Sequence, residues 1–354
     1  MKIIRFTGIT GFLLLITAAV LMGQSLADRL RTPLYFSTAL SIGYDENLLK
    51  FSELEKQNAA NSPEIMGDLE TFDSSVLRPE IRLNYSPVFF QEHATNFIFG
   101  AAYSSYQQSS AKSYSSYVFK FEQHLANYSW LKIYYSLAPE YYLRSYRDRD
   151  KINADRMDCF FDSENLYMTY SFPVIKKSWM QVKLSRKRQY YNPAFTEFDT
   201  EIKAGELRIY SSRVRGLRLS VWYSVGKGDN VSYDSGYYTT GNDRSYDYYQ
   251  AGGSVYYYPG KWLDKVALSI RGDRRDYLTD SAEDPLHAGR RHLDLQTSFW
   301  LDKSLTNDVT AQLRFVYSDK TTVSKYDWVE ELKTYSRFQI WLKFSYDFYL
   351  DILY

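Results

Sequence analysis

The chain ends in a nineteen-residue segment, Ser336 to Tyr354, in which apolar and polar side chains alternate. From Phe338 onward every even position is apolar or aromatic, and most odd positions are polar, with Trp341, Tyr349 and Leu353 as exceptions. A period of two over this length indicates a β-strand whose two faces meet different environments. Strands of soluble sheets average about 5–6 residues, whereas a tilted membrane-spanning strand needs roughly 9–11. The segment therefore predicts a membrane strand, with a long edge strand of a secreted β-sandwich as the alternative.

An alternating segment that stops on an aromatic residue resembles the last strand of Gram-negative outer-membrane β-barrels. In that family the barrel-assembly machinery recognises such a C-terminal segment. The residues that match the pattern are Tyr346, Phe348, Leu350, Ile352 and Tyr354. The resemblance implies that the barrel-assembly machinery is a partner during biogenesis. It also implies that the folded protein lies among outer-membrane lipid and lipopolysaccharide in a Gram-negative-type bacterium.

Residues 1–27 have the features of a secretory signal peptide. Lys2 and Arg5 form a positively charged start, residues 12–22 form an apolar core, and Ser25-Leu26-Ala27 is a small-x-small cleavage site. A retained membrane helix is the alternative, but the apolar run is short for the roughly 20 residues of a span. We therefore expect export, cleavage, and a mature single domain, residues 28–354. About six residues then precede the first strand, so we expect no plug domain.

The composition agrees with a barrel and argues against two other classes of protein. Aromatic residues make up 18% of the chain, including 35 Tyr, although the mean hydropathy is only −0.44; aromatic girdles and a polar lumen account for both values. Without Lys2 and Arg5, 41 basic and 42 acidic residues remain, so the charge gives no case for nucleic-acid binding. Cys159 is the only cysteine, so the fold is not a disulfide scaffold.

The alternating pattern recurs along the mature chain and predicts an all-β fold, a transmembrane antiparallel up-and-down barrel of about fourteen strands. Short connections follow the even-numbered strands and long ones follow the odd-numbered strands. With the first strand entered from the periplasm, the short connections are periplasmic turns and the long ones are extracellular loops. The segment 43–47, Gly-Tyr-Asp-Glu-Asn, ends the first strand and resembles a G-Y-D-x-N segment of several barrel families. In strand eight, residues 198–211, the apolar positions change parity, which predicts a β-bulge.

Three tryptophans occupy equivalent places after short connections: Trp130, Trp179 and Trp262. Tryptophan favours the headgroup boundary, where an apolar ring and a polar N–H are both accommodated. We therefore predict that these three residues belong to an aromatic girdle.

One face of the predicted strands carries many charged side chains. In lipid, each midplane Arg or Lys would cost roughly 2–4 kcal/mol, so this face must line water or form ion pairs. The candidate lumen residues are Arg78, Glu80, Arg82, Lys120, Glu122, Lys132, Glu140, Arg144, Lys183, Arg218, Lys265, Arg271, Asp273, Arg275, Asp294, Arg314, Arg337, Lys343 and Asp347. Cations outnumber anions thirteen to six in this set, which favours a pore that admits small polar or anionic solutes. A salt-bridged wall without selectivity is the alternative.

The function predicted from these features is porin-like, passive passage of small hydrophilic solutes, anionic ones among them. The alternative is a closed structural or surface barrel whose Tyr-rich loop, residues 232–249, binds a partner or a polysaccharide.

Catalytic and metal chemistry find little support in the sequence. His292 and Asp294, two residues apart on the inner face, are the only pair similar to a hydrolase site, and no serine signature accompanies them. Asp229, Asp234 and Asp243 lack the spacing and the glycine of an EF-hand loop, so a solvated loop is expected and an extracellular Ca²⁺ site is the alternative. We therefore expect no catalytic residue, no metal and no cofactor.

Overall fold

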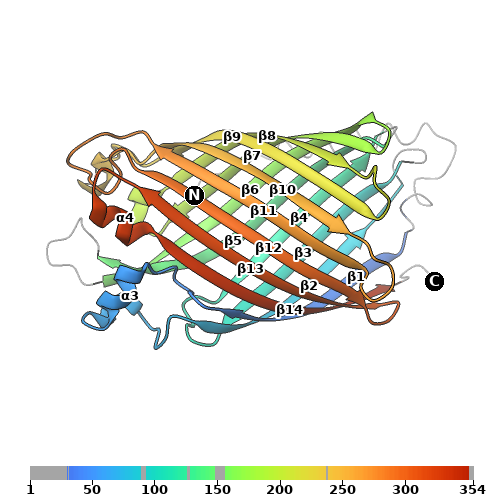
Figure 1. Ribbon diagram of the computed structural model, residues 1–354, viewed down its shortest axis with the longest axis horizontal. Coiled ribbons are helices and arrows are strands. Elements are labelled where there is room, and N and C mark those ends of the chain that lie inside the picture. Colours follow the sequence, from blue (N-terminus) through green and yellow to red (C-terminus); the bar gives the residue numbers. More distant parts are fainter. Residues whose placement is uncertain are drawn as a thin grey trace.

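The computed structural model describes residues 30, 32–88, 93–125, 128–147, 156–236 and 238–350. These residues form fourteen β-strands that close into one antiparallel barrel, in which each strand bonds to its neighbours in sequence and β1 bonds to β14 (Figure 1). The strands are β1 (Leu34–Asp45), β2 (Ser74–Tyr85), β3 (Thr95–Tyr106), β4 (Tyr114–His124), β5 (Trp130–Arg147), β6 (Arg156–Ile175), β7 (Ser178–Tyr191), β8 (Thr200–Ser211), β9 (Leu217–Asn230), β10 (Tyr246–Tyr257), β11 (Lys265–Tyr277), β12 (Arg291–Ser304), β13 (Val309–Val323) and β14 (Tyr335–Leu350). The predicted fold class and strand number are confirmed.

The C-terminal alternating segment closes the barrel. Strand β14 pairs with β1 from Leu34–Leu350 to Asp45–Gln339, without a register shift. Closure leaves no unpaired edge, which a strand in lipid could not tolerate. Of the residues expected to form the assembly signal, Ile352 and Tyr354 lie outside the described residues, as does the expected signal peptide.

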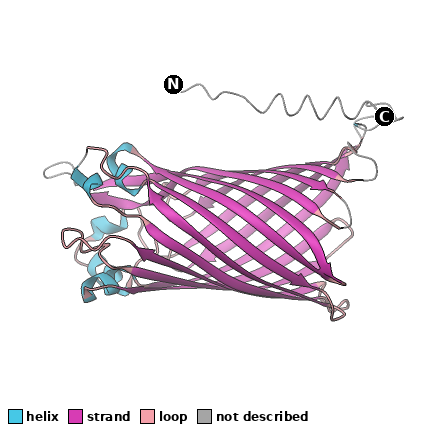
Figure 2. Cartoon of the chain, turned by 90° about the horizontal axis from the view of Figure 1, so that it is seen from above, coloured by secondary structure: helices cyan, strands magenta, loops and turns pink. Residues whose placement is uncertain are grey.

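The two ends of the barrel differ. The connections at one end are mostly short, whereas those at the other end include the longest ones and carry the described helices (Figure 2). These helices are α3 (Glu53–Ala59), η1 (Pro63–Met66), η2 (Pro193–Phe198), η3 (Tyr238–Gly241) and α4 (Asp327–Lys333). By the predicted orientation, the helical end is extracellular. Among the described residues, no helix is long and apolar enough to cross a membrane.

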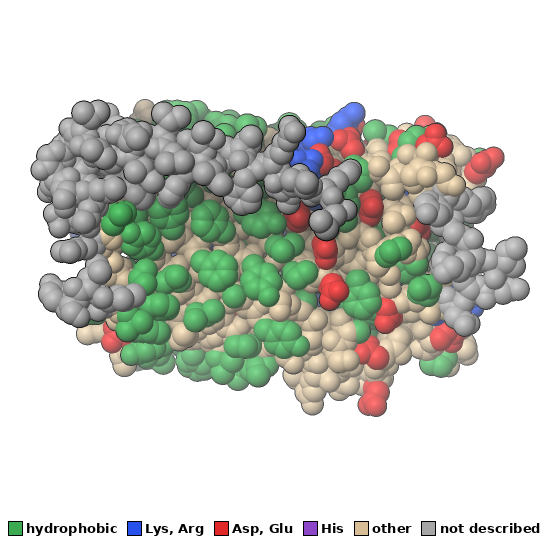
Figure 3. All heavy atoms as spheres, turned by 180° about the vertical axis from the view of Figure 1, so that it is seen from behind, with side chains coloured by type: hydrophobic (Ala, Val, Ile, Leu, Met, Phe, Trp, Pro, Cys, Tyr) green, Lys and Arg blue, Asp and Glu red, His purple; other side chains and the backbone are tan. Residues whose placement is uncertain are grey.

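The outer surface of the barrel carries a band of exposed apolar side chains (Figure 3). Ile42, Leu184 and Val221, on three different strands, are 52%, 57% and 58% exposed. A soluble monomer rarely exposes so extensive an apolar surface, whereas lipid hydrocarbon solvates it. The closed sheet and this band make the protein a membrane-spanning β-barrel.

The bulge predicted in β8 is wrong, because β8 pairs with both neighbours without a register shift. The change of parity has another cause: toward the helical end, the outward face of β8 is charged rather than apolar. Lys203 lies on that face, 2.9 Å from Glu201 and 3.6 Å from Asp229. This part of the strand therefore extends beyond the apolar band.

Register shifts occur instead in β5, on both sides of Tyr141–Tyr142, and near the end of β6 at Pro173. Glu140, expected in the lumen, lies in the β5 irregularity with a positive φ of 49° and is exposed. The alternation on which its predicted position depended is interrupted there.

The first long connection, residues 46–73, folds into the mouth of the barrel, and we call it the mouth loop. Its Leu48, Leu49 and Phe51 are at most 3% exposed and pack against inner-face residues that include Val76 and Tyr106. Helix α3 begins in this loop with a capping box, in which the Glu55 N–H donates to Ser52 Oγ (3.1 Å) and the Ser52 N–H donates to Glu55 Oε2 (3.0 Å). The main apolar cluster of the described chain thus lies inside the barrel mouth.

Candidate functional site

The predicted charged face does line the lumen, and its residues meet across neighbouring strands. Glu80 on β2 lies 3.1 Å from Arg78 and 2.6 Å from Lys343, which reaches it from β14 across β1. Arg78 also donates to Ser104 and Ser116 of the next strands. The side chains therefore form a continuous polar lining.

A second group lies on the wall formed by β4 to β8, around a pocket of about 290 Å³. Lys132 pairs with Glu122, and Lys183 pairs with Glu206, each at 3.1 Å. Glu206 also accepts from Arg208 at 2.9 Å. Four basic residues and two acidic residues line this pocket, so its acids do not balance its bases.

A third group lies on the opposite wall. Asp273 is 3.1 Å from Arg271, Asp294 is 3.9 Å from Arg275, and Lys265 pairs with Asp302. Asp347 shares the inward face of β14 with Lys343.

Several predicted lumen cations have no ion-pair partner among the described residues: Arg82, Lys120, Arg218 and Arg314. Three of them lie over aromatic rings instead, Lys120 over Tyr134 (5.5 Å), Arg218 over Trp179 (5.8 Å) and Arg314 over Trp300 (5.9 Å). A ring face attracts a cation without cancelling its charge. These cations therefore still contribute a positive potential to the lumen.

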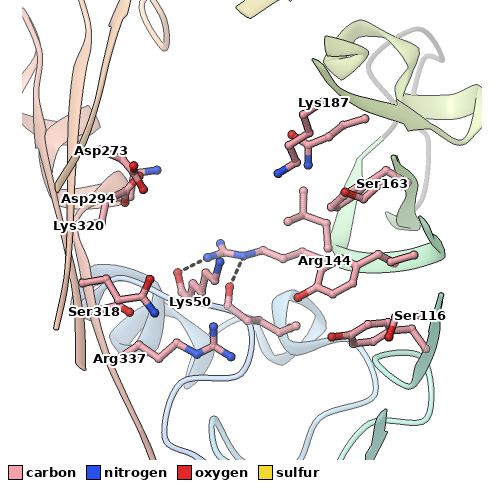
Figure 4. Close-up of a pocket in the computed structure, with 18 of the residues that line it drawn as sticks. Lys50, Ser116, Arg144, Ser163, Lys187, Asp273, Asp294, Ser318, Lys320 and Arg337 are labelled. Carbon is pink, nitrogen blue, oxygen red and sulfur yellow. Dashed lines mark hydrogen bonds between the residues drawn. The ribbon is translucent and has the colours of Figure 1, made fainter. Parts of the chain in front are cut away.

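A cavity with a volume of about 790 Å³ lies in the half of the lumen nearest the helical end. Its lining comes from opposite walls, from β2 and β4–β7 on one side and β11–β14 on the other, together with the mouth loop (Figure 4). Nine basic and three acidic residues line it. The basic residues are Lys50, Arg78, Arg144, Lys187, Arg271, Arg275, Lys320, Lys333 and Arg337.

Lys50 reaches this cavity because the mouth loop is clamped to the wall. Arg144 on β5 donates from Nε to the Leu49 carbonyl (2.7 Å) and from Nη2 to the Lys50 carbonyl (Figure 4). Its Nη1 donates to Glu55 Oε1 (2.6 Å). Lys50 itself has a positive φ of 57°. The clamp holds the Lys50 backbone in this uncommon conformation.

The segment that resembles G-Y-D-x-N supplies the other anchor of the mouth loop. Asp45 binds Arg337 of β14 and also accepts from Gln339 (3.0 Å). Asn47 Nδ2 donates to the carbonyls of Phe51 and Ser336, each at 2.9 Å. Together these bonds tie the start of the loop to the last strand.

Gly43 in the same segment makes room for an aromatic ring. A Cβ at this position would lie 2.4 Å from the Trp341 ring, so a larger residue would displace that ring from the mouth.

Two loop lysines have pKa values below the usual range. Although the Lys50 side chain is exposed to the cavity, the protein around the mouth desolvates it, and this desolvation is the main cause that lowers its pKa to about 8. The charges of Arg337 and Lys112 lower it further, while Tyr141 and Asp294 oppose them.

Lys112 is only 3% exposed, and burial is the main cause that lowers its pKa to about 7. Its Nζ donates to the Tyr142 carbonyl (2.6 Å) and lies 4.4 Å from the Tyr141 ring centre. Lys112 therefore supports the mouth structurally, and Lys50 is the loop lysine that a solute would meet.

Sequence reasoning missed Lys50, Lys187 and Lys320. Lys187 continues the inward parity of Gln181 and Lys183 on β7, and Lys320 continues that of Arg314 on β13, so extending both strands would have found them. No local signal places Lys50 in the lumen, because its position depends on Arg144, far away in the sequence.

The expected aromatic girdle is wrong for two of its three tryptophans. Trp130 shares the inward face of Lys132, whose Nζ lies 5.4 Å from its ring, and Trp179 stacks on Tyr210 with ring centres 5.3 Å apart. Both rings line the lumen near the end opposite the helices, where they meet cations rather than lipid. Trp262 lies in a short connection and is 88% exposed.

The structure does not bring His292 and Asp294 together as a catalytic pair. His292 Nδ1 lies 2.9 Å from Thr322 Oγ1, whereas Asp294 lies near Arg275. Among the residues that the structure describes, no group of three or more His, Cys, Asp or Glu is arranged to hold a metal ion.

The Tyr-rich segment 232–249 is partly internal. Tyr246 is 5% exposed, and the Tyr248 hydroxyl donates to Asp273 of the lumen wall (3.3 Å). These two tyrosines are therefore not available on the outer surface for a partner.

No protein-family model and no curated protein matches this chain. Among solved structures, it is similar to the outer membrane channel DcaP of Acinetobacter baumannii, at 10% identity and a TM-score of 0.44, covering 89% of this chain and 96% of that one. It is also similar to an anion-selective porin from Comamonas acidovorans, at 9% identity and a TM-score of 0.40, with coverage of 89% and 98%. A third is OccD3 of Pseudomonas aeruginosa, at 8% identity and a TM-score of 0.42, with coverage of 92% and 97%. Likeness at these identities and TM-scores carries nothing about solute or mechanism.

Proposed function

We propose that this barrel is a channel for the passive passage of small hydrophilic solutes through the outer membrane and that it prefers anions. The observation that carries the proposal is the cavity of about 790 Å³ in the lumen, lined by nine basic and three acidic residues. A cavity enclosed by a low-dielectric wall and lined by one sign of charge concentrates ions of the opposite sign.

The excess of positive charge continues toward the periplasm. The smaller pocket on the β4–β8 wall has four basic residues against two acidic ones. An anion that leaves the extracellular half therefore meets a second region of favourable potential rather than a barrier.

The acidic residues of the lumen do not cancel this field, because most of them bind a cation beside them. Glu80 lies between Arg78 and Lys343, and Glu206 between Lys183 and Arg208. Each of these acids therefore cancels the charge of only one of its two neighbouring cations. The cations that remain make the electrostatic potential of the lumen positive.

Planar-bilayer recording of the purified, refolded protein tests the proposal. The expected result is discrete, stable conductance steps whose frequency rises with the amount of folded protein added. Heat-denatured protein is the control, and heat-modifiable migration on a detergent gel shows which fraction is folded. A barrel that inserts in the folded form but carries no current contradicts the proposal and supports the closed-barrel alternative.

A further inference from the structure

We propose that the extracellular half of the lumen contains a binding site for small anions that carry two or more negative charges, and that Lys50, Lys187 and Lys320 contact them there. This inference rests on the proposed anion passage. It adds the class of solute and the place at which that solute is held.

The three lysines approach one cavity from three directions. Lys50 comes from the mouth loop, Lys187 from β7 on one wall and Lys320 from β13 on the other (Figure 4). Among the described residues, none of the three forms an ion pair. Lys320 lies 5.8 Å from the Tyr335 ring centre, a contact that steadies the ammonium group without neutralising it.

Charged side chains on opposite walls of this cavity are close enough to interact electrostatically with one another. The guanidinium groups of Arg271 and Arg275 on β11 lie within electrostatic range of Lys187 on β7. Lys50 is within range of Arg337 and Asp294. One anion in the cavity therefore interacts with several cations at once.

Such a field discriminates by valence. Coulomb energy is proportional to the charge of the solute. If the cavity concentrates a monovalent anion by a given factor, it concentrates a divalent anion of the same size by about the square of that factor. Multivalent anions are therefore held much more strongly than chloride or a monocarboxylate.

The site is also preorganised. Arg144 fixes the carbonyls of Leu49 and Lys50, and Asn47 fixes the start of the turn on Phe51 and Ser336. These bonds fix the backbone from which the Lys50 side chain extends, so the loop itself loses little conformational freedom when an anion binds. The volume of about 790 Å³ lies within the usual range of small-molecule pockets and leaves space for a partly hydrated anion.

Two of the three acidic residues of the cavity are already engaged by a cation, and the third, Asp319, accepts from Thr321 Oγ1 (3.4 Å). Asp273 binds Arg271 (3.1 Å) and also accepts from Tyr248 (3.3 Å) and Gln250, while Asp294 lies 3.9 Å from Arg275. These contacts place the acids beside the β11 arginines. The lysines are left to an incoming solute.

Inhibition of chloride current by pyrophosphate tests this site, with acetate as the monovalent reference. In the wild-type channel, pyrophosphate added on the extracellular side should block at far lower concentration than acetate. Lys50→Gln, Lys187→Gln and Lys320→Gln should each raise the blocking concentration about three- to tenfold, because each removes one nearby unit charge. Lys120→Gln is the matched control, since Lys120 is also a lumen lysine without an ion pair but lines the other pocket.

The outcomes separate this inference from the proposed function. If the channel conducts but pyrophosphate blocks no better than acetate, or if Lys120→Gln weakens the block as much as Lys50→Gln, the site is refuted while anion passage stands. If the folded barrel carries no current, the proposed function fails. Calorimetric titration of the detergent-solubilised barrel with pyrophosphate then decides: binding that Lys50→Gln weakens and Lys120→Gln leaves unchanged supports the site, and absence of binding refutes it.

Discussion

Replacement of Glu80 by Gln should increase the anion preference of the channel. Glu80 is the acid shared by Arg78 (3.1 Å) and Lys343 (2.6 Å), and its side chain is 25% exposed to the lumen. The substitution removes one negative charge and leaves both cations without their common partner. Arg78 keeps its bonds to Ser104 and Ser116, so we expect the barrel to fold normally.

The size of the effect follows from Coulomb's law with screening. A unit charge about 6 Å from a passing ion contributes about 0.7 kcal/mol in water. At 0.1 M salt the Debye length of about 10 Å reduces this to about 0.4 kcal/mol. Anion passage should then rise roughly twofold and cation passage fall by a similar factor, so that the permeability ratio changes about three- to fourfold. At 1 M salt the change should nearly vanish.

The assay is the zero-current potential of the bilayer across a salt gradient, measured for wild type and variant at low and high ionic strength. Glu164→Gln is the matched control, because Glu164 lies on the outer face of β6, 3.8 Å from Arg188. It should leave the ratio unchanged. An anion preference that stays the same or falls in folded Glu80→Gln refutes the assignment of this ion-pair group to the lumen.

Three further predictions follow from particular residues. Because the pKa of Lys50 is lowered to about 8, its positive charge is present below that pH and lost above it; anion preference should fall as the pH rises through 8, and Lys50→Arg should remove this step in the same recordings. Val182→Arg, on the lipid face of β7, should destabilise the barrel by about 2–4 kcal/mol in urea unfolding from vesicles, whereas a similar loss in Gln181→Arg, on the lumen face, would contradict the assigned faces. Deletion of residues 352–354 should reduce the heat-modifiable folded form in cells far more than it changes the conductance of the barrels that do assemble; normal assembly would refute the role of this C-terminal segment.

The strands and their two faces could be predicted because a barrel in lipid imposes a strict local rule. One face of each strand meets lipid and the other face meets the lumen. The period of two in β14 or β9 therefore directly indicates which side chains meet lipid. Ion pairs such as Glu122–Lys132 and Arg271–Asp273 then follow from parity and antiparallel pairing.

The rule fails where the strand leaves the membrane. Near the helical end of β8, beyond the apolar band, the outward face is polar as well as the inward face. Lys203 therefore lies outward, and the change of parity imitates a bulge although the register is continuous. It fails differently for Trp130 and Trp179, because an amphipathic ring suits a cation-lined lumen as well as a headgroup boundary. The parity of Lys132 was the local signal that would have placed Trp130 inward.

The mouth loop could not be predicted from local sequence at all. Its position depends on bonds between residues far apart in the chain, Arg144 to Leu49 and Asp45 to Arg337. Only the closed barrel brings these partners together, and with them it brings Lys50 into the lumen.

The most direct test of the central claim is the sign of the zero-current potential of the wild-type channel across a potassium chloride gradient at low ionic strength. An excess of basic over acidic residues around the lumen cavity predicts a potential displaced toward the equilibrium potential of chloride. A displacement toward the equilibrium potential of potassium would contradict the account.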